Sequence, residues 1–202
     1  MKTRLFEISA FFALFICIVS CLSFESDCES IRSKVLRLHV IANSDSKADQ
    51  ALKLKVRDAV LISSEELFTS DSQSEAEREI ESALDALRVS AESAVTAEGY
   101  GYSVRVTFEP TYFPTRIYGN VTLPAGIYKS LKVIIGEGEG KNWWCVLFPP
   151  MCLPAVSSEK EVLSKVLSDE ELDLVGRKPR YEVRFWITEK LQEFKRSYKS
   201  KA

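Results

Sequence analysis

The chain has 202 residues, 46% of them hydrophobic, and a formal net charge of −2. This size and hydrophobic content suffice for one globular domain with a real core. So weak a net charge, with basic residues gathered only near the end of the chain, argues against a protein that binds nucleic acid by neutralising phosphates. His39 is the only histidine, so any Ser–His or Cys–His catalytic mechanism would have to use it.

The first 23 residues indicate a secretory signal peptide or a short membrane anchor. Lys2 and Arg4 precede the apolar residues 8–19, which are few for a comfortable bilayer span but fit the apolar region of a signal peptide. Cys21 follows Ile-Val-Ser, as in the lipobox of bacterial lipoproteins, and Ser23 is a small residue of the kind that precedes an ordinary cleavage site. We expect export from the cytoplasm, with cleavage, lipidation at Cys21 and retention as an anchor as open alternatives.

One domain is expected to begin after a short polar segment. Residues 24–34 predict a tether or a first short helix, and residues 35–202 predict a single α+β domain with a mostly antiparallel sheet covered by amphipathic helices. The first strand is predicted over 35–41, where apolar and polar side chains alternate.

Two amphipathic helices are predicted next, each with one apolar stripe that suits the cover of a sheet. Ser46 and Asp49 form a capping box for the first helix, which is expected to end near Phe68. Ser74 and Glu77 form a second capping box, for the second helix.

The remaining strands are predicted in the middle of the chain, over residues 102–108, 116–123, 128–135 and 143–148. Two prolines make the aromatic segment 110–114 a stiff connection, and the strand after it is expected to bulge at Gly119. The last two strands are joined by a glycine-rich turn and are expected to form a hairpin. The second of them is almost continuously apolar, which predicts a strand in the middle of the sheet.

The end of the chain is predicted to be helical, over 157–174 and again over 181–198. Before these helices, Cys145 and Cys152 flank a Pro-Pro turn, and in an oxidising compartment such a pair predicts a disulfide. Two buried thiols are the alternative for this pair, and Cys28 has no obvious partner.

No catalytic, metal or cofactor site is predicted. The glycine-rich turn 136–140 lacks the spacing of a phosphate-binding loop, and its glutamates would repel phosphate. No pair of histidines or cysteines has the spacing of a zinc site, and no glutamate lies in an apolar setting that would raise its pKa for glycosidase chemistry. His39 either is a hydrogen-bonded structural residue or forms a polar site with Asn43 and Asp45 at the end of its strand.

Several blocks together resemble one family, the stage II sporulation protein R of endospore-forming bacteria. These blocks are Arg37–Asp45 (RLHVIANSD), Gln50–Asp58 (QALKLKVRD), Tyr112–Gly119 (YFPTRIYG), Leu123–Gly126 (LPAG) and Gly140–Pro150 (GKNWWCVLFPP). They stand between residues 35 and 152 and are long and unusual in composition.

The resemblance implies a non-enzymatic signalling protein. It would be exported from the forespore into the space between the two membranes, where a membrane-embedded aspartic protease of the mother cell needs it to process pro-sigma-E. No catalytic residue is carried over. The expected contact surface is the loop Asn43–Asp45 with His39, together with the aromatic segment represented by Tyr112, Phe113, Arg116 and Tyr118.

A second class stays open beside this one. A secreted cell-wall hydrolase or peptidoglycan-binding protein would also carry an export signal, and its mark would be turnover of, or retention on, purified peptidoglycan. The single histidine weighs against it.

Overall fold

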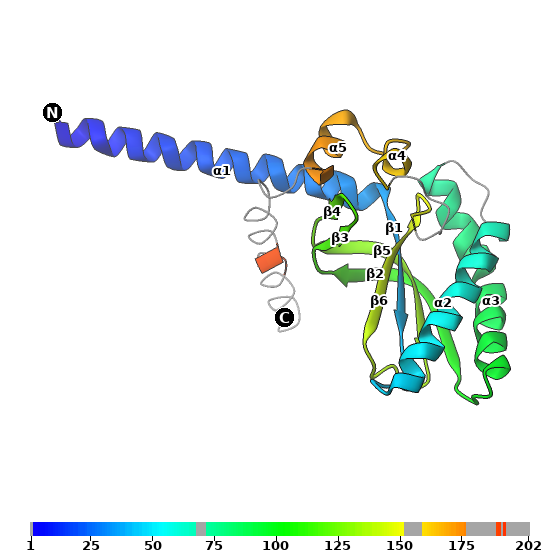
Figure 1. Cartoon of the computed structure of the whole chain (residues 1–202). Coiled ribbons are helices and arrows are strands. Elements are labelled where there is room, and N and C mark those ends of the chain that lie inside the picture. The colour runs from blue at the N-terminus through cyan, green and yellow to red at the C-terminus, as the bar shows by residue number, and fades with distance from the viewer. Residues whose placement is uncertain (1, 68–71, 152–158, 177–188, 191, 193–202) are drawn as a thin grey trace.

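A computed structural model describes residues 2–67, 72–151, 159–176, 189–190 and 192. The helices are α1 (Lys2–Lys34), α2 (Lys47–Leu67), α3 (Gln73–Ala97), α4 (Glu159–Leu163) and α5 (Asp169–Gly176). The strands are β1 (Leu36–Ile41), β2 (Val104–Phe113), β3 (Arg116–Tyr118), β4 (Val121–Leu123), β5 (Gly126–Ile135) and β6 (Asn142–Phe148). The predicted α+β class is confirmed (Figure 1).

The described strands make a four-stranded sheet in the order β2-β5-β1-β6, and β3 pairs with β4 in a small second sheet. β1 runs parallel to β5, while the other two pairings in the main sheet are antiparallel. The sheet is therefore mixed but mostly antiparallel, as predicted.

The expected hairpin between β5 and β6 is wrong, because β1 lies between these two strands. The turn that joins them crosses the end of β1, where the backbone amides of Glu139 and Gly140 donate to the carbonyls of Asn43 and Ala42. β1 and β5 are consequently the inner strands, and the prediction of a middle strand over 143–148 is wrong, because β6 lies at the edge of the described sheet. Alternation along a strand tells which side chains share a face, but not which strands are neighbours.

Two hydrophobic cores lie on the two faces of the sheet. On one face, α2 and α3 pack against aliphatic side chains such as Leu38, Val133 and Leu147 (Figure 1). On the other face, the second core joins the end of α1 to the β3–β4 hairpin, α4 and α5. β1 contributes to both faces, since Leu36 to Val40 are all buried.

The two helices α2 and α3 confirm the predicted apolar stripes. The hydroxyl of Ser46 accepts from the amide of Asp49 at 3.0 Å, so the predicted cap of α2 is confirmed. The cap of α3 is Ser72, whose hydroxyl accepts from the amide of Glu75, and not Ser74 as predicted. The sequence contains both Ser-x-x-Glu pairs two residues apart, and the chain begins the helix at the earlier one.

The segment after α3 is more strand-like than predicted. β2 continues through Pro110 to Phe113, which is tolerated because β2 is an outer strand of the described sheet and its proline need not donate to a second neighbour. The expected bulge at Gly119 is wrong: this glycine has φ of 51° and lies in the turn of the β3–β4 hairpin.

The C-terminal helices differ from the prediction where the structure describes them. The single helix expected over 157–174 is divided into α4 and α5, separated by residues 164–168. The helix expected over 181–198 falls almost entirely outside the described residues. The carboxylate of Glu171 in α5 accepts from the backbone amide of Ser168, which directly precedes that helix, and from Ser30 and Lys34 of α1.

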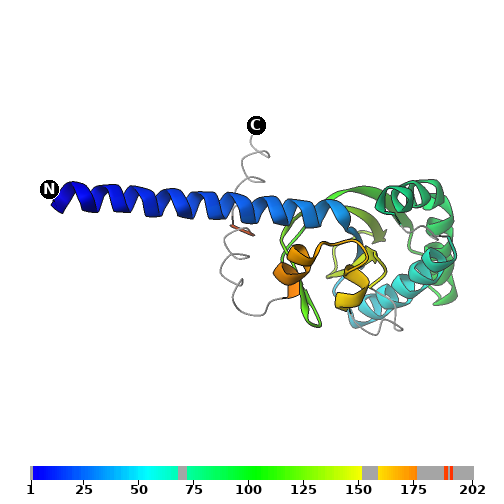
Figure 2. The same ribbon diagram turned by 90° about the horizontal axis from the view of Figure 1, so that it is seen from above.

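α1 is one unbroken helix of 33 residues. Its first part projects from the domain (Figure 2), and its last three turns enter the second core with Phe24, Cys28 and Ile31. Residues 24–34, predicted as a tether or short helix, are thus the docked end of a longer helix. The helix contains a segment, Ala10–Lys34, that is long and apolar enough to cross a membrane, which fits a signal sequence or an anchor.

Candidate functional site

A fully buried arginine, Arg37 of β1, lies at the centre of the second face of the sheet. Its guanidinium carbon lies 4.3 Å from the ring centre of Phe113, 4.9 Å from that of Tyr128 and 5.4 Å from that of Tyr118. Nε donates to the carbonyl of Cys145 at 2.9 Å, and Nη2 donates to the hydroxyl of Tyr118 at 2.5 Å. Burial lowers the pKa of Arg37, and the two tyrosines oppose this effect. The positive charge is held by rings and neutral oxygens.

His39, two residues further along β1, lies on the same face and stacks on Trp144. The two ring centres are 3.8 Å apart and the planes are inclined by 19°. The Nε2 atom lies 2.8 Å from Oδ1 of Asn142, and that oxygen accepts the proton of Nε2. Burial lowers the pKa of His39 to about 4, against the hydrogen bond to Asn142, and the charges of Lys132 and Arg37 lower it further. The imidazole is therefore neutral at pH 7.

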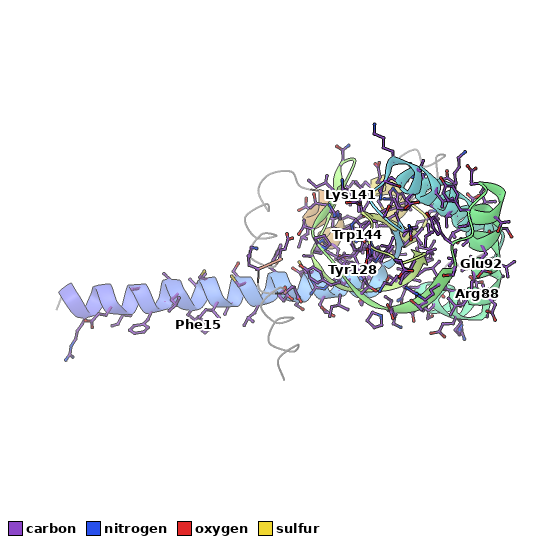
Figure 3. The ribbon with its side chains drawn as sticks, turned by 90° about the horizontal axis from the view of Figure 1, so that it is seen from below. Phe15, Arg88, Glu92, Tyr128, Lys141 and Trp144 are labelled. Atoms are coloured by element: carbon purple, nitrogen blue, oxygen red, sulfur yellow. The ribbon has the colours of Figure 1, made fainter. Side chains whose placement is uncertain are left out.

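We call these six side chains the Arg37 cluster: Arg37, His39, Phe113, Tyr118, Tyr128 and Trp144. Tyr128 and Trp144 lie within the domain, on the sheet (Figure 3). Phe113 contacts Tyr128 and Trp144 edge to face, with ring centres 5.6 and 4.7 Å apart. The cluster thus ties β1, β2, β5 and β6 to the small β3–β4 hairpin.

The hairpin forms the outer layer of the Arg37 cluster. The hydroxyl of Tyr118 donates to the carbonyl of Trp144 at 3.3 Å, and the guanidinium carbon of the exposed Arg116 lies 5.9 Å from the Trp144 ring centre. Between them in sequence, Ile117 is 69% exposed. This layer offers a cation and an apolar side chain to a partner, supported from beneath by rigid aromatic rings.

The loop Asn43–Asp45 has a different environment, at the other end of β1. Oδ1 of Asn43 accepts from the amide of Glu137 at 3.1 Å, and Oδ1 of Asp45 accepts from the amide of Lys141 at 2.7 Å. Gly136 has φ of 56°, and a Cβ there would lie 2.2 Å from Oδ1 of Asn43. These bonds fasten the glycine-rich turn across the end of β1, which is why this turn needs its glycines.

A buried carboxylate secures the same loop to α2. The carboxylate of Asp49 accepts from the hydroxyl of Ser44 at 2.6 Å and from the side-chain Nδ2 of Asn43 at 2.9 Å. These hydrogen bonds lower the pKa of Asp49, and the bond from Ser44 makes the largest contribution. The loop is therefore held on two sides, by α2 and by the glycine-rich turn.

The structure brings together four of the seven contact residues expected from the sequence: His39, Phe113, Arg116 and Tyr118. Asn43 and Asp45 belong to the glycine-rich end instead, and Tyr112 points to the opposite side of β2 from Phe113. His39 and Phe113 are 5% and 0% exposed, so they support the surface rather than form it. The sequence reasoning missed Arg37, whose signal was a charged residue inside a strand of otherwise apolar side chains.

Two expectations about cysteines stay predictions. Cys145 is buried in the first core, while Cys152 lies outside the described residues, so their disulfide is untested. Cys21 is exposed on α1, and its lipidation is likewise untested. In the described part of the chain, no group of three or more His, Cys, Asp or Glu side chains could hold a metal ion.

The comparisons with known proteins cover the Arg37 cluster and the glycine-rich end together. The family model described as stage II sporulation protein R matches residues 32–158. The stage II sporulation protein R of Bacillus subtilis (strain 168) is 41% identical over 136 residues. That match covers 65% of this chain and 59% of the Bacillus protein, so the chain spans less than two thirds of its relative's length. No solved structure matches the chain.

Proposed function

This chain belongs to the stage II sporulation protein R family, and we propose that it is an exported sporulation signal that activates a membrane-embedded aspartic protease. The protease would then process pro-sigma-E in the mother cell. The family match over residues 32–158 carries this proposal, because it contains both the Arg37 cluster and the glycine-rich end. An apolar helix at the start of the chain supports export into the space between forespore and mother cell.

The contact surface in this proposal is the outer layer of the Arg37 cluster. Arg116 is exposed, and its guanidinium is positioned over Trp144. Tyr118 is fixed from beneath by Arg37. A preorganised cation beside aromatic rings suits a protein partner, since arginine and aromatic side chains dominate the energetic centres of interfaces. His39 and Phe113 act by holding this layer in place, and Asp45 offers a second, separate contact.

Reconstitution tests the proposal. The full chain is incorporated into vesicles that hold the candidate protease, pro-sigma-E is added, and cleavage is followed on gels. We expect cleavage that depends on the chain, and about a tenfold loss with Arg116→Ala, as for an arginine near the energetic centre of an interface. The matched control is Arg78→Ala, which removes an exposed arginine of α3 and should leave cleavage unchanged.

Two outcomes would contradict the proposal. A competent protease that shows no stimulation would exclude direct activation. Turnover of purified peptidoglycan by the same preparation would favour the cell-wall alternative. Equal losses with Arg116→Ala and Arg78→Ala would contradict the contact surface alone.

A further inference from the structure

The first part of α1 is apolar on all sides. The segment Ile8–Ser23 contains 16 residues and no charged side chain. Consecutive residues of a helix point about 100° apart, and Leu14, Phe15 and Ile16 are 57%, 62% and 53% exposed. Phe15 projects from the helix far from the domain (Figure 3). A protein groove covers one stripe of a helix, whereas all-round exposure of apolar side chains suits lipid.

The length and the flanking charges of this segment also suit a bilayer. At 1.5 Å per residue, 16 residues extend about 24 Å, a few ångströms less than a bilayer core of about 30 Å, and local thinning of the bilayer accommodates such a difference. Lys2 and Arg4 stand before the segment, where long basic side chains can reach the headgroups. Glu25, Asp27 and Glu29 stand after it, on the side of the domain.

The other end of α1 is fixed rigidly in the domain. Arg32, only 3% exposed, donates to the carbonyl of Ala125 at 2.9 Å and pairs with Glu25 and Glu29. Gly126 leaves room for it, because a Cβ there would lie 2.4 Å from Cδ of Arg32. The helix is continuous from the apolar segment into this anchor. No flexible linker separates the two.

One end of the domain consequently faces the direction from which the helix arrives. The β3–β4 hairpin, the joined ends of β2 and β5, and α5 all lie on that side, while α2 and α3 lie on the far side (Figures 1 and 2). This near end carries two exposed isoleucines, Ile117 of β3 at 69% and Ile127 of β5 at 54%, and the exposed Arg116 precedes Ile117 on β3.

We propose that α1 is retained as a membrane-spanning helix and holds the near end of the domain, with Ile117 and Ile127, against the lipid surface. The same bilayer would contact both apolar surfaces, the first part of α1 and the end of the domain with Ile117 and Ile127. The helix supplies the anchorage, and its rigid junction supplies the orientation. This inference concerns lipid and stands apart from the protease proposal, because its tests use vesicles without any protease.

The first test is the mass of the exported chain. Retention predicts the full-length mass in the membrane fraction of sporulating cells. A mass that corresponds to cleavage after Ser23, or to a lipidated chain beginning at Cys21, would overturn the proposal.

The second test measures depth in the membrane. A dye is attached to cysteine in Ile117→Cys, Ile127→Cys or Ile62→Cys, in the full chain with Cys17 and Cys21 replaced by serine. The chain is inserted in phosphatidylcholine–phosphatidylglycerol vesicles that carry a quencher on the lipid. We expect several-fold stronger quenching at 117 and 127 than at 62, because Ile62 is 58% exposed but lies on α2 at the far end. Equal quenching at all three positions would overturn the proposal.

The third test breaks the rigid junction. Insertion of a flexible Gly-Ser segment after Ser23 leaves the apolar segment and the docked turns intact. A dye at Phe15→Cys should stay quenched, while quenching at position 117 should fall to the level seen at 62. Quenching that persists at 117 would show that the domain finds the lipid without the helix, and absence of quenching at 15 would show that α1 does not enter the bilayer. Either result contradicts the proposal.

Discussion

The two faces of the sheet are built in opposite ways. The face under α2 and α3 is a core of aliphatic side chains, supplied by two helices that follow each other directly in the sequence. The other face gathers segments from both halves of the chain around a buried arginine and histidine. The first face needs only burial, whereas the second also needs specific hydrogen bonds and ring contacts. Such a face tolerates fewer substitutions, because each polar group buried there must keep its partners.

The largest effect is expected from removal of the buried guanidinium. Arg37→Ala should destabilise the fold by about 3–5 kcal/mol, since it leaves a cavity among three rings and removes the donor to Cys145 and Tyr118. Urea unfolding measures the change. Arg105→Ala, at an exposed arginine of β2, is the matched control and should stay within about 0.5 kcal/mol. If the two substitutions lowered the free energy of unfolding by similar amounts, the contacts of the Arg37 guanidinium would not be needed for the second face.

The second-largest effect is a pH dependence of stability, which comes from His39 on the second face. The pKa of His39 is about 4 in the fold and 6.5 ordinarily, so protonation favours the unfolded chain. The contribution of neutral His39 is complete above pH 6.5 and is lost as pH falls toward 4. Between pH 7 and pH 5 we expect a loss of about 2 kcal/mol. Urea unfolding of the wild type and of His39→Gln at both pH values isolates this term, because His39 is the only histidine. Identical pH dependence in the two proteins would contradict it.

The glycine-rich end, where both faces meet, should give a smaller effect. Gly136→Ala places a methyl group against Asn43 at a positive φ, so we expect about 1–2 kcal/mol of destabilisation. Gly101→Ala is the control, since no atom lies within 4 Å of a Cβ there and φ is ordinary. Thermal unfolding compares the two. A neutral Gly136→Ala would mean that the turn rearranges without loss.

The smallest effect concerns the helical face alone. Ser72→Ala removes the cap of α3 and should cost about 1 kcal/mol. Ser74→Ala, at an exposed position inside the first turn, should cost clearly less. The reverse order would place the start of α3 at the later serine.

The sequence predicts the face under α2 and α3 well, because the helical spacing of apolar residues identifies the buried side of each helix. Ile80, Leu87, Ala91 and Val95 recur on one side of a helix and are all buried as expected. The second face follows no local period. The position of β1 between β5 and β6 depends on contacts with residues about a hundred positions away. Pro110 also argues in the sequence against a strand over its own position. The structure tolerates this proline within β2 because β2 lies at the edge of the sheet.

The candidate site was predicted in part for the same reason. Phe113, Arg116 and Tyr118 are close in sequence, and their shared surface follows from that closeness. Arg37 and Trp144 belong to it only through the pairing of β1 with β6, in which His39 lies opposite Trp144. A neutral, stacked histidine and a caged arginine are consequences of tertiary structure, and the sequence shows them only as polar residues in an apolar strand.

The inner position of β1 also determines the order of folding. Leu38 pairs with Leu131 and Cys145, which are synthesised 93 and 107 residues later. Closing loops of this length is slow, and the sheet cannot be completed before residue 148 is available. Until those late strands are available, a chain of this topology stays unfolded, the state in which a chain can pass through a membrane channel. In the export that we propose, the late strands would postpone folding until translocation is nearly complete, and the domain would then assemble outside the cytoplasm.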